Sequence, residues 1–140
     1  MLGLARYENG RNSPHFLLDS AEKIEKEVRR LRIEIFVVKT TKPDFYELQE
    51  AKRSLIKLFG GLTVIPKALG YWLNPQTGTI ERDLVEIWLV YADLPEPKEE
   101  ADRIHVESQL NTLMRILSLI KKATHQKSQA YAIDNKIHFI

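Results

Sequence analysis

Two glutamates within apolar, strand-like segments are the residues best suited to acid–base chemistry. Glu34 interrupts the apolar run 33–38, and Glu86 interrupts the run 84–92. Where neighbouring strands bring two carboxylates onto one apolar face, burial and mutual repulsion raise their pKa values, which is the property that a general acid or base uses. Arg32 and Arg82 share that face by strand alternation and can neutralise the pair. Structural ion pairing is therefore the favoured interpretation, and catalysis is the alternative.

The histidines and cysteines give little support to metal chemistry. The chain has no cysteine, which excludes thiolate nucleophiles, iron–sulfur clusters and cysteine-ligated zinc. Its four histidines lie on different expected elements without ligand spacing, so we expect no metal site: His15, His105, His125 and His138. His138 alternates onto the face opposite Ile137 and Phe139. From there it is a candidate to join Glu86 and Trp88 around a pocket, and an ordinary surface position is the alternative.

Phosphate and nucleic-acid signatures are also weak. The sequence contains no G-x-x-x-x-G-K-[ST], G-x-G-x-x-G or G-x-S-x-G, and Gly60-Gly61 follow an expected helix rather than a strand. We therefore expect no cofactor. Phe36 and Trp88 on the central strands suggest the base-stacking sheet of an RNA-recognition motif. However, the segment 86–91 lacks the basic-Gly-aromatic pattern, and the glutamates would repel phosphate, so nucleic-acid binding is disfavoured.

Length and composition indicate one ordinary domain. The chain has 140 residues, of which 44% are hydrophobic, and a formal net charge of +2. This charge is too small to favour a nucleic-acid or membrane surface. We expect a loose N-terminal arm over 1–12 and a single domain over 13–140. No run approaches the ~20 apolar residues of a membrane-spanning helix, and the N-terminus lacks a signal-peptide core, so a cytoplasmic protein is expected.

Periodicity predicts the elements of the first half of the chain. Apolar residues at helical spacing predict a helix over 14–30, and alternation with β-branched residues predicts a strand over 32–40. A second helix is predicted over 44–59. Asp44 and Glu47 form its capping box, and Gly60-Gly61 end it.

The second half begins with a hairpin. A strand over 62–73 is disturbed by Pro66 and Gly70, which indicates an edge strand with a bulge. The turn 74–78 leads into a long strand over 79–91. A long amphipathic helix follows, marked by Val106, Leu110, Leu113, Leu117 and Ile120. Short strands over 130–133 and 136–140 then flank the tight turn at Asp134-Asn135.

The element order is βαββαβ preceded by an extra helix. This order predicts an α+β fold of the ferredoxin-like type, an antiparallel sheet with strand order 4-1-3-2, helices on one face and an extra N-terminal helix. Such a sheet can leave its other face in water only if its central strands alternate cleanly between apolar and polar residues.

The central strands do not alternate cleanly. In the first strand, the residues expected to face the helices are Ile33, Ile35 and Val37, and those on the opposite face are Arg32, Glu34, Phe36 and Val38. In the third strand, the corresponding sets are Val85, Ile87, Leu89 and Tyr91 toward the helices, with Leu84, Glu86, Trp88 and Val90 opposite. The exposed patch requires a cover, either the N-terminal helix, a second subunit or a ligand.

The hairpin carries a resemblance. Its segments are Gly61-Leu62-Thr63-Val64, Gly70-Tyr71-Trp72 and Gly78-Thr79-Ile80-Glu81-Arg82. Together they resemble small uncharacterised bacterial proteins with a G-L-T-V…G-x-W…G-x-I-x-R-E hairpin, although the order Glu81-Arg82 departs from that signature. The resemblance covers about a quarter of the chain and implies no activity. Trp72 and Glu81 are its candidates for a shared site.

The sequence thus favours a protein that acts by association, as a homodimer through a sheet face centred on Phe36 and Trp88. It offers no catalytic constellation and leaves open whether the protein is an enzyme. The alternative is a small enzyme or ligand-binding protein whose pocket contains Glu34, Glu86, Trp88 and His138. A third and less favoured interpretation is single-stranded RNA binding.

Overall fold

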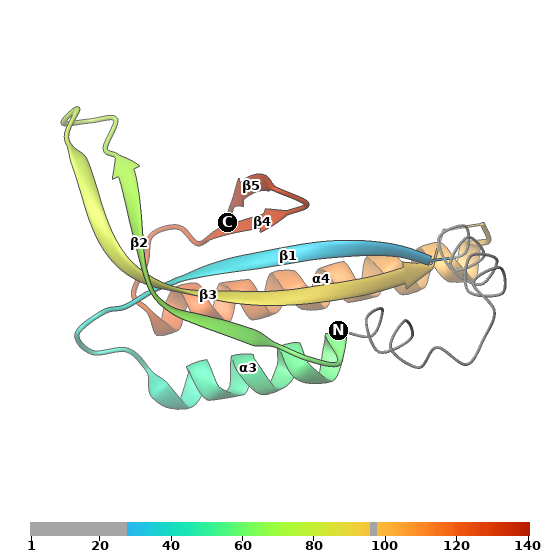
Figure 1. Cartoon of the computed structure of the whole chain (residues 1–140). Coiled ribbons are helices and arrows are strands. Elements are labelled where there is room, and N and C mark those ends of the chain that lie inside the picture. The colour runs from blue at the N-terminus through green and yellow to red at the C-terminus, as the bar shows by residue number, and fades with distance from the viewer. Residues whose placement is uncertain (1–27, 96–97) are drawn as a thin grey trace, which may run out of the picture.

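The structure is a computed structural model that describes residues 28–95 and 98–140 (Figure 1). Its elements, in chain order, are β1 (Val28–Val38), α3 (Phe45–Phe59), β2 (Thr63–Leu73), β3 (Ile80–Pro95), α4 (Glu100–Ala123), β4 (Ala130–Ile133) and β5 (Lys136–Phe139). The expected loose N-terminal segment 1–12 and residues 14–27 of the expected first helix lie outside the described residues. Residues 28–30, which were also assigned to that helix, belong instead to β1.

The described chain is an α+β protein built on one antiparallel sheet. The sheet has five strands in the order β2-β3-β1-β4-β5, and each neighbouring pair is antiparallel. The first four strands therefore have the expected order, and β5 extends the sheet beyond β4. Helices α3 and α4 lie together on one side of the sheet (Figure 1).

Local signals set the ends of α3. The Asp44 side chain accepts a hydrogen bond from the Glu47 backbone N–H, at 3.1 Å. At the other end Gly60 adopts φ 87°, and its N–H donates to the carbonyl of Ile56. The Asp44 cap and the Gly60 ending follow the sequence prediction, because they satisfy backbone groups that the helix cannot. The second half of the predicted capping box is not formed, since the Asp44 N–H donates to the carbonyl of Ala123 instead of the Glu47 side chain.

A bulge divides β2 into two parts. The pairing register between β2 and β3 shifts between Ile65 and Ala68, and Lys67 within the shift has φ 59°. Both the predicted bulge and the edge position of β2 are confirmed. Beyond the bulge, residues 68–85 form a β-hairpin that rises away from the helices (Figure 1); we call it the arm. Its turn is held by the Asn74 side chain, which accepts from the backbone N–H of Gln76 at 3.0 Å.

The register of β1 with β3 corrects the expected faces. Trp88 lies opposite Ile35, and Val90 lies opposite Ile33. Directly opposed residues share a face, so Trp88 and Val90 point toward the helices while Ile87 and Leu89 point to the other side. Trp88 is only 1% exposed. The expected faces of β1 are confirmed, whereas the register reverses those predicted for β3 at Val85, Glu86, Ile87, Trp88, Leu89, Val90 and Tyr91.

The core explains this reversal. Buried side chains of β1, β3, α3 and α4 pack in one cluster that includes Ile33, Ile35, Leu55, Trp88, Leu113 and Leu117. Residues 84–92 of β3 are apolar at nearly every position, so their alternation does not specify a face. Placing the indole of Trp88 between sheet and helices buries the largest side chain of the strand. Within the described ranges, neither helix is both long and apolar enough to cross a bilayer.

The reversed face predicts unequal effects for the two tryptophans. Trp88→Ala is expected to lower the free energy of unfolding by about 3–5 kcal/mol, because it leaves a cavity in the core. Trp72→Ala is the matched control, since Trp72 is partly exposed on the arm, and it should cost much less. Urea unfolding at low protein concentration measures both. Equal losses would contradict the assignment of Trp88 to the helix side.

Candidate functional site

The side of the sheet away from the helices is apolar and accessible. We call it the open face. Its larger apolar side chains, given by the strand registers, are Phe36, Val38, Ile65, Ile87, Leu89, Tyr91, Ile137 and Phe139. All eight are half-buried or exposed, and Phe139 is 61% exposed. Val85, which lies opposite Val38 on the same face, is buried. No helix within residues 28–95 or 98–140 covers this face (Figure 1). Phe36 belongs to it, as expected, whereas Trp88 does not.

The arm encloses a hollow above the open face. This arm hollow has a volume of about 140 Å³, and its lining includes Phe36 and Val38 from β1, Trp72 and Glu81 from the arm, and Phe139 from β5. Two candidates from the sequence, Phe36 and Trp72, are therefore brought together. The Trp72 ring packs directly on Gly70, where a Cβ atom would lie 3.0 Å from the Trp72 Nε1 atom.

The expected pair of carboxylates does not form. Glu34 lies opposite Leu89 on the open face, whereas Glu86 lies opposite Val37 on the helix side. Glu34 instead lies beside Arg32, with Nε and Oε1 3.5 Å apart. Arg82 lies opposite Tyr71 within the arm rather than beside Glu86. The two glutamates cannot act as one acid–base pair, because the sheet separates them.

Glu86 is part of a different polar group. Trp88 Nε1–H donates to Glu86 Oε1 at 3.1 Å, and Lys39 Nζ donates to Oε2 at 3.0 Å. Burial of Glu86 raises its pKa, but hydrogen bonds from Trp88 and Lys39, together with the charges of Lys39 and Lys52, outweigh burial and hold the pKa below its ordinary value. Glu86 is therefore a stable carboxylate, not the raised-pKa acid that the sequence suggested.

His138 lies away from Glu86 and Trp88. It pairs with Tyr131 on β4, Tyr131 pairs with Ile35 on β1, and Ile35 pairs with Trp88 on β3. Three strand spacings of about 4.8 Å therefore separate His138 from Trp88. The imidazole of His138 stacks on the Tyr131 ring at a centroid distance of 5.3 Å. The expected pocket containing Glu34, Glu86, Trp88 and His138 does not exist in the described chain.

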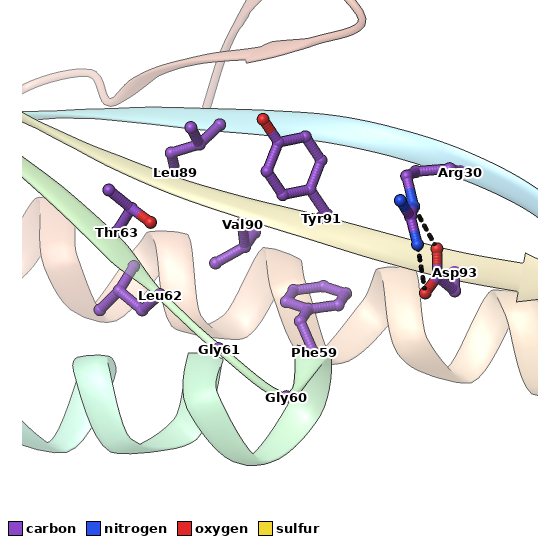
Figure 2. Close-up of a pocket in the computed structure, with 10 residues that line it drawn as sticks. All are labelled: Arg30, Phe59, Gly60, Gly61, Leu62, Thr63, Leu89, Val90, Tyr91 and Asp93. Carbon is purple, nitrogen blue, oxygen red and sulfur yellow. Dashed lines mark hydrogen bonds and ion pairs between the residues drawn. The ribbon is translucent and has the colours of Figure 1, made fainter. Parts of the chain in front are cut away.

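A larger groove lies where β2 leaves β3. Pairing between β2 and β3 ends at Thr63 and Leu89. From Val90 onward, the edge of β3 opposite β1 therefore has no partner among the described strands. The groove beside this edge measures about 580 Å³ and is walled by Phe59 and the Gly60-Gly61 turn (Figure 2). We call it the edge groove. Arg30 and Asp93 form an ion pair at its end, with Nε and Oδ1 2.7 Å apart.

Sequence reasoning missed the residues that complete these sites. Arg30 and Asp93 lie outside the predicted strand bounds 32–40 and 79–91, although the true strands extend over both. Lys52 lies on α3 and is 36 positions from Trp88, yet its Nζ atom is 5.3 Å from the Trp88 ring centroid. No spacing within the sequence indicates that contact. Among described residues, no group of three His, Asp or Glu side chains is arranged to hold a metal ion.

The lowered pKa of Glu86 predicts a pH-dependent stability. Its charged form stabilises the fold above its ordinary pKa, and this contribution disappears as the pH falls through the lower folded-state value. Glu86→Gln should therefore reduce the free energy of unfolding by about 1–2 kcal/mol at neutral pH and by less in acid. Urea unfolding across the acidic range measures the gap. Glu107→Gln, an exposed residue of α4, is the control; a gap for Glu86→Gln that persists in acid would contradict the assignment.

The chain is similar in structure to two kinds of protein. The sequence matches no protein-family profile and no curated protein. Among solved structures, CutA1 from Oryza sativa is similar at 12% identity, with 77% of this chain and 80% of that chain covered and a TM-score of 0.45. A phage SAM lyase in complex with S-methyl-5'-thioadenosine is similar at 9% identity, with 82% and 89% covered and a TM-score of 0.45. The phage SAM lyase in its apo state is similar at 11% identity, with 79% of this chain and 86% of that chain covered and a TM-score of 0.42.

Proposed function

We propose that this protein acts by self-association, and that a second copy of the chain covers the open face. The proposed architecture is a ferredoxin-like βαββαβ domain with β5 added at the edge of its sheet. The observation that carries the proposal is the composition of the open face. Phe36, Ile87 and Leu89 lie at its centre, on the two central strands, where a solvent-facing sheet normally carries polar residues, and Arg32 and Glu34 of β1 are the charged residues beside them.

The arm supplies a second apolar surface, which no other described element covers. The register of the arm places five large apolar side chains, together with Arg82, on the side opposite the arm hollow: Leu69, Tyr71, Leu73, Ile80 and Leu84. All five are exposed, and Ile80 at the tip is 73% exposed. A two-stranded hairpin is marginally stable in water, so a projecting arm with an apolar side benefits from packing against another surface. This favours a second copy, because one chain then offers two apolar surfaces on different elements.

The amount of apolar surface suits a specific interface. Nine of the thirteen exposed large apolar side chains among described residues lie on the open face or on the outer side of the arm. A standard interface removes about 800 Å² from each partner. Burying apolar surface contributes about 25 cal/mol of favourable free energy per Å². Apolar side chains gathered on two surfaces can be buried together in one interface, whereas scattered ones cannot. The free edge of β3 at the edge groove offers backbone hydrogen bonds in addition.

Two kinds of closed assembly let the arm of one copy pack on the open face of another. In a two-fold dimer, which the sequence favoured, the arm of each copy packs on the open face of the other. A closed ring satisfies the same two surfaces by a different rotation. Acidic groups in the arm hollow, Glu81 and Asp83, disfavour a phosphate backbone as the occupant of the open face.

Removing the apolar side of the arm should abolish association without unfolding the chain. Leu73 and Ile80 face each other across the arm, so the double variant Leu73→Glu with Ile80→Lys keeps a favourable cross-strand pair while removing apolar surface. We expect light scattering to give a multiple of the chain mass for the wild type and a single chain mass for the variant, with unchanged circular dichroism.

The control for this experiment is Ile104→Glu. Ile104 is an equally apolar and exposed residue of α4, outside both proposed surfaces, so its substitution should leave the mass unchanged. A wild type that remains a single chain at micromolar concentration would overturn the proposal. Association that survives in the arm variant would show that the arm is not part of the interface.

A further inference from the structure

A small cavity on the helix side has the features of a ligand site. It lies where the chain leaves β1 and enters α3, and its volume is about 190 Å³. Its polar lining residues are Lys39, Thr40, Gln49, Lys52 and Glu86. Its apolar walls come from β1, the connection to α3 and the first turns of α3. We call it the lysine cavity. It is a different space from the arm hollow and the edge groove, although Val38 borders both it and the arm hollow.

The charges of the cavity favour an anion. Both oxygens of Glu86 are engaged, one by Lys39 and one by the Trp88 indole. Lys52 is different, because no carboxylate of the described residues lies within 4.0 Å of its ammonium group. Its Nζ atom instead lies 5.3 Å from the Trp88 ring centroid. Two ammonium groups and one carboxylate leave one positive charge without a partner in a partly enclosed space.

The hydroxyl of Thr40 lacks a hydrogen-bond partner. Its Oγ1 atom is buried, and it is one of three buried side-chain polar atoms without a partner among described residues; the others are Gln109 Oε1 and Gln129 Oε1. Because this atom has almost no solvent-accessible surface, an occupant of the cavity does not reach it, and Lys52 is the group that favours an anion.

The remaining wall suits an apolar body. Pro43, Phe45 and Leu48 line the cavity, and Phe45 is 70% exposed although it begins a helix whose opposite side is in the core. A volume of 190 Å³ corresponds to about six water molecules at roughly 30 Å³ each. It is smaller than the ~300–1,000 Å³ of drug-sized pockets. The occupant must therefore be a small molecule rather than a nucleotide or a peptide.

We propose that the lysine cavity binds a small organic carboxylate, whose anionic group contacts Lys52 and whose apolar body packs on Phe45 and Leu48. Lys39 is held by Glu86 and frames the site. Glu86 and the Trp88 indole keep one orientation through their hydrogen bond, so the floor of the cavity is already formed before the ligand enters.

Benzoate is a suitable probe, and the chain contains its own reporter. The two tryptophans give two indole N–H signals in a ¹⁵N–¹H spectrum, with Trp88 at the cavity and Trp72 on the arm. Ligands of this size bind with dissociation constants on the order of 1 mM, so titration to about 20 mM approaches saturation. We expect a saturable shift of the Trp88 signal and a much smaller shift of the Trp72 signal. Benzylamine, with the opposite charge, should give no saturable shift.

Variants and smaller anions separate the parts of the proposal. Lys52→Met should weaken benzoate binding about tenfold or more, whereas Lys57→Met, an exposed lysine of the same helix, should not. Acetate and inorganic phosphate, which lack the apolar body, should bind more weakly than benzoate. The urea midpoint of each variant checks that it is folded.

Three results would overturn the proposal. These are no saturable Trp88 shift with benzoate, equal shifts at both tryptophans, or unchanged affinity in the folded Lys52→Met variant. Acetate binding as tightly as benzoate would exclude the apolar contact and with it the proposed ligand class. The titration is repeated on the Leu73→Glu with Ile80→Lys variant, so that a failure of self-association and a failure of ligand binding are measured separately.

Discussion

The pairing of β1 with β3 determines on which side of the sheet Glu34, Glu86 and Trp88 lie. Because strand residues alternate between faces, placing Trp88 opposite Ile35 puts Glu86 on the helix side and Ile87 and Leu89 on the open face. A shift of one residue would reverse all of these positions. The energetic reason for the observed register is the indole of Trp88, which fills the space between the sheet and the two helices. The open face and the lysine cavity are two consequences of this one choice.

Local features of the fold were predictable from sequence because local chemistry determines them. Asp44 and Gly60 define α3 through hydrogen bonds to neighbouring backbone groups, and Pro66 marks the bulge because proline cannot donate to a strand ladder. The order of the first four strands followed from the element sequence and the handedness of crossovers. None of these predictions required knowledge of which distant residues touch.

The site could not be predicted to the same extent, since it depends on distant contacts. In β3, apolar residues on both faces remove the alternation that would identify the core side, and the carboxylate of Glu86 suggested a solvent-facing position. That carboxylate is instead tolerated near the core because Lys39 and the Trp88 indole satisfy it at the end of the strand. The contact between Lys52 and the Trp88 ring joins a helix to a strand, and only the packed structure brings them together.

The arm hollow and the lysine cavity meet at the end of β1. Val38 lines both the arm hollow and the lysine cavity, because β1 ends there and its last side chain borders both spaces. A carboxylate in the cavity and a second copy over the open face would therefore contact the same residue. If one occupant changes the affinity for the other through Val38, the second changes the affinity for the first by the same factor, because coupling between two binding equilibria is reciprocal. Contact at Val38 is thus the direct way in which ligand occupancy and assembly would influence each other.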